Sequence, residues 1–192
     1  MSIQAIIFDC FGVLYNDAFK DFLQRNAKSI NGNEGYYYDL ANKSDTGQIS
    51  DDEFYNALQE VSGEDPVALK REFHDTHHVN QGLVALIRQL KPRYKIGMLS
   101  NSGRAMLDEF MAEHKITDLF DIVIASSETP FIKPQREIFE LIADRLQLPL
   151  EDLYFVDDSA TNTFAAQSYG MHVHTYVSVT ELHGALQKEG IL

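Results

Sequence analysis

Cysteine and positive charge are both scarce in this sequence. Cys10 is the only cysteine among 192 residues, which excludes an intrachain disulfide and a cysteine-based zinc site. The 16 lysines and arginines stand against 29 acidic residues, so the formal net charge is −13. Binding to nucleic acid or to anionic lipid draws its affinity from clustered basic side chains. We therefore expect neither a nucleic acid nor a membrane as the main partner.

Long hydrophobic runs are missing as well. No segment approaches the roughly 18 consecutive apolar residues of a membrane-spanning helix. The first residues lack the basic region and the small-residue cleavage site of a signal peptide. From these absences and the single cysteine, we expect an unprocessed, soluble protein of the cytoplasm.

Short apolar runs recur along the chain and alternate with segments of helical period. With 192 residues, 44% of them hydrophobic, the chain is long enough for one domain, or one domain with an insert, around a sizeable core. Continuous apolar runs are typical of parallel strands that are buried on both faces. We therefore predict an α/β fold with a Rossmann-like parallel sheet, whose strands cover residues 5–8, 96–99, 122–124, 153–156 and, as a fifth candidate, 173–177.

Helices are predicted between these runs, because apolar residues recur there at about 3.6-residue spacing. Each of the three stripes would cover the sheet with one helix face. The stripes consist of Leu83, Leu86, Ile87 and Leu90; of Met106, Leu107, Phe110 and Met111; and of Ile138, Phe139, Ile142 and Leu146.

Residues 15–79 break the alternation, because they contain helical patterns and turns but no run that resembles a buried strand. Apolar residues at 19, 22, 23, 27 and 30 line one predicted helix face. Ser50 and Glu53 have the spacing of a capping box, which predicts the start of a second helix. The sequence therefore predicts a helical cap domain at 15–79, inserted into a core domain of residues 1–14 and 80–192.

Polar side chains follow four of the predicted strands. They are Asp9, Ser100, Lys133 and the pair Asp157-Asp158. Because the carboxyl ends of parallel strands meet at one edge of a sheet, these side chains can converge on a single pocket. Carboxylates, a hydroxyl group and a lysine suit a hard cation together with an anionic substrate.

Four short motifs, in this order, resemble motifs one to four of the haloacid dehalogenase-like hydrolase superfamily. The resemblance spans nearly the whole chain and implies a cap inserted after the first motif. Within the superfamily, residues 47–51 and the Asp-Asp-Ser form of the fourth motif are similar to sugar-phosphate phosphatases of the glucose-1-phosphatase kind. The motifs are Asp9-Cys10-Phe11-Gly12-Val13-Leu14, Leu99-Ser100-Asn101, Lys133-Pro134 and Phe155-Val156-Asp157-Asp158-Ser159, the last followed by Asn162 and Gly170.

The resemblance implies a nucleophile and a metal site. Asp9 would attack phosphorus and form an aspartyl-phosphate, a known use of a carboxylate in covalent catalysis. Mg²⁺ would be held by Asp9, the backbone carbonyl of Phe11 and Asp158. Asp157 would stand behind these ligands and orient a metal-bound water.

The resemblance also implies a phosphate site. Ser100 and the backbone amide of Asn101 would bind phosphate oxygens, while Lys133 would offset negative charge on the nucleophile and the phosphoryl group. The expected protein is thus a Mg²⁺-dependent phosphatase that acts on a small phosphomonoester, with a sugar phosphate as one candidate.

One position departs from the pattern of these phosphatases. Most of them carry a second Asp two residues after the nucleophile, which protonates the leaving group and later activates water; here that residue is Phe11. General acid–base help is worth about 10² to 10⁴ in rate, so a slow or non-catalytic relative is one alternative.

A metal-independent 2-haloacid dehalogenase is the other alternative, because dehalogenases resemble this chain in having an aromatic residue followed by Gly here. That chemistry has to bind a carboxylate, and the predicted cap offers only Arg25 and Arg71 as arginines for it. Asp157 and Asp158 would moreover repel a haloacid unless a cation compensates them.

Overall fold

The structure is a computed structural model that describes residues 3–192, and its centre is a five-stranded sheet. All strand pairs are parallel, in the order β3-β2-β1-β4-β5. This confirms the predicted Rossmann-like α/β fold. The strands are β1 (Ala5–Phe8), β2 (Lys95–Ser100), β3 (Ile122–Ala125), β4 (Leu153–Asp157) and β5 (His172–Thr175).

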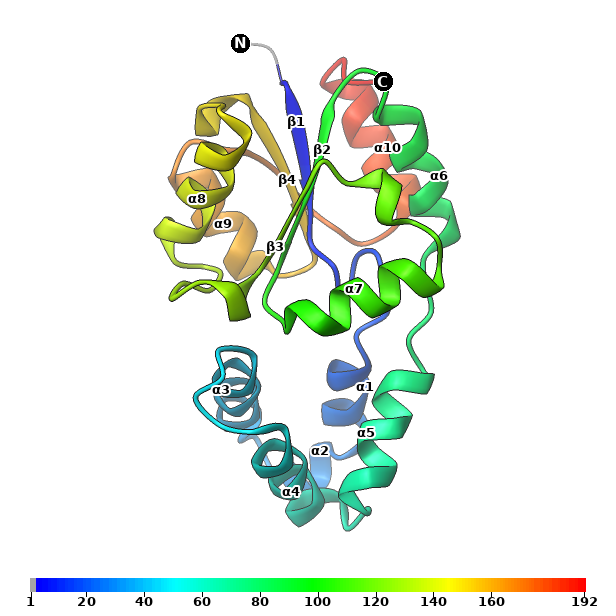
Figure 1. Cartoon of the computed structure of the whole chain (residues 1–192), viewed down its shortest axis with the longest axis vertical. Coiled ribbons are helices and arrows are strands. Elements are labelled where there is room, and N and C mark those ends of the chain that lie inside the picture. Colours follow the sequence, from blue (N-terminus) through cyan, green and yellow to red (C-terminus); the bar gives the residue numbers. More distant parts are fainter. Residues whose placement is uncertain (1–2) are drawn as a thin grey trace.

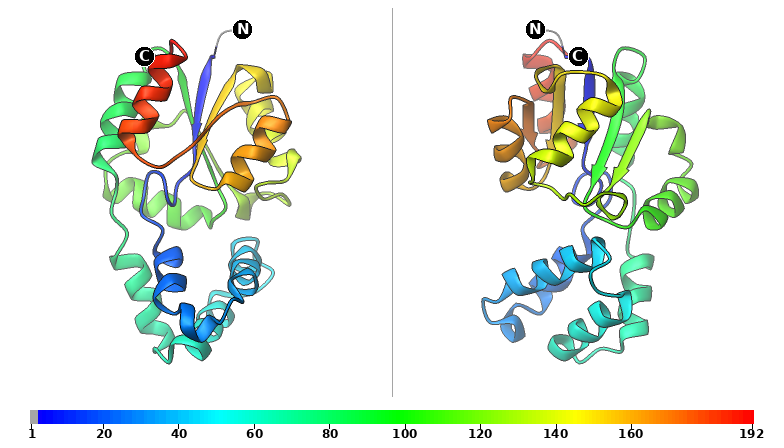
Figure 2. Two further views of the ribbon diagram at one scale, coloured as in Figure 1. Left: turned by 180° about the vertical axis from the view of Figure 1, so that it is seen from behind. Right: turned by 60° about the vertical axis from the view of Figure 1, so that its left-hand side comes forward.

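Helices cover both faces of the sheet, as Figure 2 shows from two sides. Successive side chains of a strand point to opposite faces. Ile6 and Phe8 accordingly pack with α6, α7 and α10, whereas Ala5 and Ile7 pack with α8 and α9. The three predicted stripes lie in α6, α7 and α8, and this confirms them. The helices are α6 (Gln81–Leu90), α7 (Arg104–Glu113), α8 (Arg136–Leu146), α9 (Ala160–Ser168) and α10 (Val179–Lys188).

Five further helices lie together beyond the carboxyl ends of the strands (Figure 1). They surround a hydrophobic cluster of their own, which includes Phe22, Leu58 and Leu69. We call them the α1–α5 segment. Its helices are α1 (Ala18–Arg25), α2 (Ala27–Ile30), α3 (Glu34–Asp45), α4 (Asp51–Ser62) and α5 (Pro66–Asp75).

The ends of two helices show how far local sequence determines this segment. The capping box is confirmed: Ser50 N–H donates to Glu53 Oε2 at 2.8 Å, and Glu53 N–H donates to Ser50 Oγ at 3.3 Å. The single helix face expected over residues 19–30 is wrong in one respect, because the helix is interrupted at Asn26. The Asn26 side chain donates to the carbonyl of Phe22 at 3.0 Å, a local bond that competes with helix continuation.

The fifth strand ends earlier than predicted. β5 stops at Thr175, and Val177, which the prediction included, is 68% exposed. Ser178 then accepts a hydrogen bond from Glu181 N–H and caps α10. An apolar residue in the short connection was therefore mistaken for strand.

The chain enters and leaves the α1–α5 segment at one place. Tyr15 and Val79 form an antiparallel bridge, and Asn80 N–H donates to the carbonyl of Leu14 at 2.8 Å. Tyr15 is buried, and its hydroxyl group donates to the Phe110 carbonyl of α7 at 2.9 Å. Both connections are thus anchored on the part of the molecule that contains the sheet and helices α6–α10, which we call the sheet-side body. None of the helices described within residues 3–192 has the length and apolar character needed to cross a membrane.

Asp45 gives a first prediction. Burial, with a smaller contribution from the Asp51 carboxylate, raises the pKa of Asp45 from 3.8 to about 8. The C-terminal end of α3 disfavours a negative charge there as well. Because the folded chain holds this proton more tightly than the unfolded chain, the stability is complete below pH 3.8 and declines as the pH rises to about 8.

Asp45→Asn removes that proton dependence. We expect its thermal midpoint at pH 8.5 to exceed that of the parent by roughly 2 to 4 °C, and the two proteins to agree at pH 4, measured by circular dichroism. Asp39→Asn, a change at an exposed carboxylate on the same helix that pairs with Lys43, is the control. An equal gain at both pH values would contradict the assignment.

Candidate active site

Three neighbouring strands bring the predicted site residues together. In the sheet, Phe8 of β1 is level with Met98 of β2 and with Val156 of β4. The next residues, Asp9 and Asp157, therefore emerge side by side at the carboxyl edge. The carboxylates of Asp9, Asp157 and Asp158 each offer an oxygen within 4.8 Å of the others.

Lys133 joins two of these carboxylates. Its Nζ lies 2.7 Å from Asp9 Oδ1 and 2.7 Å from Asp157 Oδ2, and all three residues are buried. Burial and the Asp157 charge raise the pKa of Asp9, which the Lys133 ammonium partly offsets. Burial alone would lower the pKa of Lys133, but the two carboxylates outweigh it and raise that pKa. The lysine therefore stays charged between its partners.

Asn101 holds the backbone of Lys133. Its Oδ1 accepts the Lys133 N–H at 2.8 Å, and its Nδ2 donates to the Lys133 carbonyl at 3.0 Å. The sequence suggested a role for the Asn101 backbone amide, and the positioning by its side chain was missed. A bond between residues 32 positions apart leaves no local trace in the sequence.

The two oxygens of Asp9 differ in their surroundings. Oδ1 accepts hydrogen bonds from Lys133 Nζ and from Cys10 N–H, the latter at 2.6 Å. No hydrogen bond to Oδ2 is found within residues 3–192. The carboxylate is thus anchored through one oxygen, and the other is free to react. The Cys10 side chain itself is buried in the core.

Asp157 and Asp158 are adjacent in sequence but differ in their contacts. Asp157 is fully buried, and both of its oxygens are occupied by Lys133 Nζ, by Ser159 N–H at 2.8 Å and by Asn162 Nδ2 at 3.1–3.2 Å. Asp158 has one such contact in the described chain, an ion pair with Lys20 Nζ of α1 at 3.0 Å. Lys20 was not foreseen, because it lies 138 residues away.

Gly12 allows Asp158 to approach the first motif. Gly12 has φ = +81°, and a Cβ atom built there would lie 2.6 Å from the Asp158 carboxyl carbon. No hydrogen bond to the carbonyl oxygen of the preceding residue, Phe11, is found in the described chain. This free carbonyl, together with two carboxylates that are not saturated by protein donors, is the all-oxygen donor set that Mg²⁺ prefers. The residues present therefore fit the metal implied by the sequence motifs.

A pair of buried hydroxyl groups stands at the end of β2. Ser102 Oγ donates to Ser100 Oγ at 3.0 Å, and each residue is only 1% exposed. Because the Ser100 oxygen accepts this bond, its own hydrogen is free to donate to a bound anion. Ser102 was not singled out by the sequence analysis, although it follows the second motif directly.

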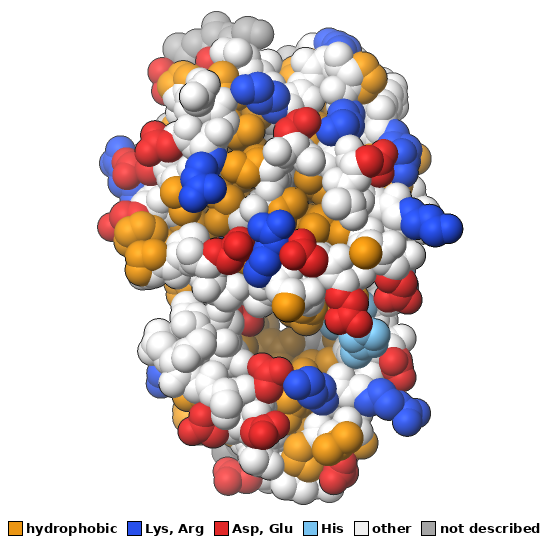
Figure 3. Space-filling view, viewed as in Figure 1, with side chains coloured by type: hydrophobic (Ala, Val, Ile, Leu, Met, Phe, Trp, Pro, Cys, Tyr) orange, Lys and Arg blue, Asp and Glu red, His pale blue; other side chains and the backbone are white. Residues whose placement is uncertain are grey.

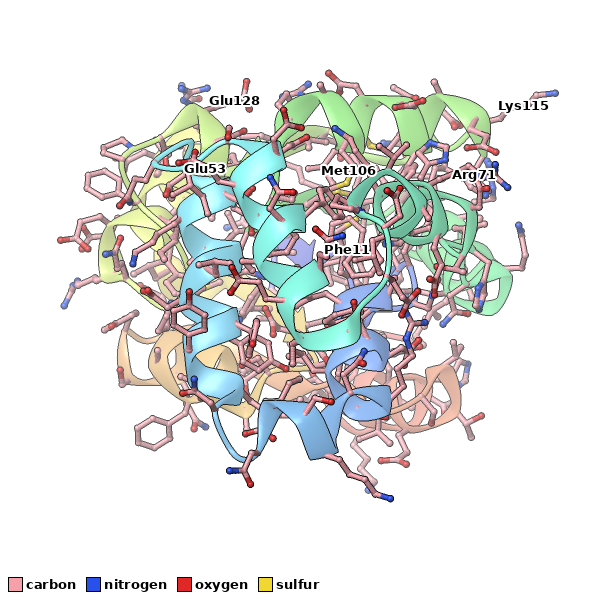
Figure 4. The ribbon with its side chains drawn as sticks, turned by 90° about the horizontal axis from the view of Figure 1, so that it is seen from below. Phe11, Glu53, Arg71, Met106, Lys115 and Glu128 are labelled. Atoms are coloured by element: carbon pink, nitrogen blue, oxygen red, sulfur yellow. The ribbon has the colours of Figure 1, made fainter. Side chains whose placement is uncertain are left out.

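Phe11, which occupies the position of the usual second Asp, is part of an aromatic cluster. Its ring lies 5.1 Å from the His77 ring and 6.3 Å from the Phe110 ring, measured between centroids. Burial lowers the pKa of His77. Seen from the α1–α5 side, Phe11 lies near the middle of the molecule (Figure 4), and the space-filling view shows a hollow between the α1–α5 segment and α7 (Figure 3).

The two candidate arginines do not gather at the carboxylate cluster. Arg25 pairs with Glu72 and, at 3.4 Å, with Glu64. Arg71 pairs with Asp75 at 3.3 Å, is 83% exposed and lies towards the rim of the molecule in Figure 4. All three ion pairs remain within the α1–α5 segment and the turns that connect its helices.

The chain belongs to the haloacid dehalogenase-like hydrolase family, whose model matches residues 3–170. It is 27% identical over 129 residues to the sesquiterpene phosphatase astK of Aspergillus oryzae, an alignment that covers 65% of this chain and 66% of that protein. It is 24% identical over 183 residues to the pyrophosphatase PpaX of Bacillus cereus, covering 88% of this chain and 81% of the other. Dehalogenases are also among the matching proteins.

Solved structures share the fold. A HAD family enzyme from Bacteroides thetaiotaomicron, in complex with magnesium and inorganic phosphate, superimposes with a TM-score of 0.72 at 22% sequence identity. The match covers 92% of this chain and 95% of that one. At this level of identity the comparison supports the fold, and the family assignment identifies the chain as a hydrolase.

The Lys133 network gives a second prediction. Lys133→Met leaves two carboxylates buried without their counter-ion, which costs about 3–5 kcal/mol when a buried pair is broken. We expect the thermal midpoint, measured by circular dichroism in the presence of chelator, to fall by roughly 10 °C. Adding Asp157→Asn to this variant should recover part of the loss, because it removes one of the uncompensated charges. A midpoint of Lys133→Met within about 2 °C of the parent would refute the network's structural role.

Proposed function

We propose that the protein is a Mg²⁺-dependent phosphatase that transfers a terminal phosphoryl group of a small phosphorylated metabolite to water. The observation that carries the proposal is the cluster of Asp9, Asp157 and Asp158 beside one buried lysine. Such a concentration of negative charge is suited to a hard cation and a phosphate held together. The phosphatases among the relatives support the same reaction class. The similarity to the glucose-1-phosphatase kind stays a prediction.

The proposed roles follow from which oxygen atoms of the site accept no hydrogen bond from the described protein. Asp9 Oδ2 attacks phosphorus and forms an aspartyl-phosphate, while Lys133 and Cys10 N–H hold Oδ1 in place. Asp9, Asp158 and the Phe11 carbonyl would hold Mg²⁺, which when bound would neutralise the phosphoryl oxygens and hold the reactants in line. Asp157, saturated by protein donors, positions Lys133 and remains outside the ligand set.

The phosphate oxygens have their own donors in this proposal. Ser100 donates its hydroxyl hydrogen, and the backbone amide of Asn101 donates beside it. Lys133 contributes positive charge beside the nucleophile, 2.7 Å from Asp9 Oδ1. The same lysine thus stabilises the folded protein and offsets the charge that develops during transfer.

We also propose that residues 15–79 act as a cap domain over a core of residues 1–14 and 80–192. The separate hydrophobic cluster of the α1–α5 segment and its position over the strand ends support this division. A lid of this kind limits the access of water and selects the substrate.

The direct test of the proposal is phosphate release from 4-nitrophenyl phosphate. We expect turnover with Mg²⁺, loss of turnover with chelator, and a decrease of at least about 10³-fold in Asp9→Asn, which removes the nucleophile. Cys10→Ala, a change of the neighbouring side chain, should retain activity. Turnover that persists in chelator, or in Asp9→Asn, would refute the mechanism, and bound Mg²⁺ without any turnover would favour the non-catalytic alternative.

Phe11 yields a separate prediction about leaving groups. We expect Phe11→Asp to raise the ratio of alkyl phosphate to aryl phosphate hydrolysis by about tenfold or more, because an acid is needed only when the leaving group is strongly basic. The ratio of kcat/KM values is measured on the same protein sample, so partial unfolding cancels. Phe11→Leu, which removes the ring without adding an acid, should leave the ratio unchanged. An unchanged ratio in Phe11→Asp would mean that another group supplies the acid.

Metal-independent dehalogenation is the competing activity, and the aromatic residue followed by glycine at 11–12 favours it. The two aspartates at 157–158 and the distant arginine pairs oppose it, because an anionic haloacid would meet negative charge. Halide release from 2-chloropropionate, measured with chelator, would reverse the assignment.

A further inference from the structure

The direction of attack assigns the leaving group to one side of the site. Asp9 lies at the end of β1, within the sheet-side body, and the α1–α5 segment lies beyond that end (Figure 1). In an in-line displacement the leaving group departs opposite to the nucleophile. The leaving group of a substrate on Asp9 therefore faces the α1–α5 segment.

Among the lysines and arginines of that segment, Lys20 is the one whose ion pair, within residues 3–192, reaches the rest of the molecule. Residues 15–79 contain six lysines and arginines. Within residues 3–192, the ion pairs of four of them stay inside the same stretch, and none is found for Lys28. The four are Arg25, Lys43, Lys70 and Arg71, whereas Lys20 reaches Asp158 at 3.0 Å.

The contact between Lys20 and Asp158 is well placed to exchange partners. The Lys20 side chain is 48% exposed and the Asp158 side chain 19%, so the pair is partly solvated and contributes little to stability. Asp158 is also a proposed metal ligand. When its carboxylate serves that purpose, the Lys20 ammonium is left beside the site without its present partner and can bind another anion.

Phe11 restricts the chemistry of the leaving group at the same place. An alkoxide leaving group needs a proton, and the aromatic cluster of Phe11, His77 and Phe110 has no carboxyl group to provide it. A phosphate leaving group departs as a stable anion and needs none. The absent acid and the available ammonium thus point to the same kind of substrate.

We infer that Lys20 binds an anionic leaving group. The preferred substrate class is accordingly a diphosphate, whose terminal phosphoryl group is transferred to Asp9. The inference rests on the proposed function. In the first step Asp9 Oδ2 bonds to the terminal phosphorus, the bond from that phosphorus to the bridging oxygen breaks, and its electron pair leaves with the departing phosphate. In the second step water attacks the aspartyl-phosphate, the bond from phosphorus to Asp9 breaks, and the proton of the water goes to the released phosphate.

The neighbours of Lys20 are compatible with this role. Asp17 caps α1 by accepting the Lys20 N–H at 2.9 Å, and burial raises the pKa of its carboxyl group. Tyr38 of α3 lies close enough for the charges of Asp17, Lys20 and Asp158 to act on its phenol. Its hydroxyl group adds a neutral donor to the same region.

The decisive experiment compares substrates that differ in the charge of the leaving group. With Mg²⁺, wild-type protein should hydrolyse pyrophosphate with a higher kcat/KM than acetyl phosphate or 4-nitrophenyl phosphate, whose leaving groups carry no charge before the bond breaks. Lys20→Met should lower kcat/KM for pyrophosphate by roughly 10- to 100-fold, the size expected for a lost hydrogen bond to a charged group. It should change the two reference substrates by less than about threefold.

Binding of inert analogues provides a readout that does not depend on turnover. By calorimetry at fixed free Mg²⁺, methylenediphosphonate should bind wild-type protein at least about tenfold more tightly than it binds Lys20→Met. Methylphosphonate, which lacks the second anionic group, should bind both proteins equally. Lys20→Arg, which keeps the charge, should retain most of the difference between the two analogues.

Lys70→Met is the matched control, because Lys70 is also an α1–α5 lysine paired with an aspartate, Asp51, but within that segment. It should behave as the wild type in both assays. Equal losses on all substrates in Lys20→Met, or a wild-type enzyme without preference for pyrophosphate, would overturn the inference while leaving the phosphatase intact. Failure of wild-type protein to hydrolyse acetyl phosphate, 4-nitrophenyl phosphate and pyrophosphate would refute the proposed function itself.

Discussion

The buried contact of Lys133 with Asp9 and Asp157 is the constraint around which the site is arranged. Two carboxylates at the ends of adjacent strands would repel each other in a region of low dielectric, and one ammonium 2.7 Å from each resolves that conflict. The lysine comes from a loop after β3, so the contact ties that loop to the centre of the sheet. Asn101 completes the arrangement by holding the lysine backbone.

The three aspartates of the cluster differ in their contacts. Both oxygens of Asp157 accept hydrogen bonds from protein donors, whereas Asp9 is held through one oxygen and its other oxygen is free. Asp158 contacts a partly exposed lysine. Groups with the same chemical structure thus differ in what they can do, because their neighbours differ. The three acids of the cluster are therefore not equivalent.

Much of the fold could be predicted, because it depends on local pattern. The apolar runs predicted the parallel strands. The predicted stripes lie on α6, α7 and α8 and pack against these strands. The convergence of Asp9, Ser100, Lys133 and the two aspartates of the fourth motif followed from the rule that parallel strands end at one edge. The interruption at Asn26 and the clamp by Asn101 could not be predicted, because both depend on where a side-chain amide finds a carbonyl or an N–H group. The contact of Lys20 with Asp158 depends on how the α1–α5 segment sits over the sheet, which no local pattern encodes.

The bridge between Tyr15 and Val79 has a mechanical consequence. Because the chain crosses between the two parts at adjacent points, the α1–α5 segment is attached as if by a single hinge. Lys20 and Asp158 lie on opposite sides of the hinge, so a rotation there changes the distance between them. Asp9, Lys133 and Asp157 all belong to the sheet side, so their geometry is insulated from the same rotation. The buried contact of Lys133 with Asp9 and Asp157 can therefore keep its geometry while the α1–α5 segment moves.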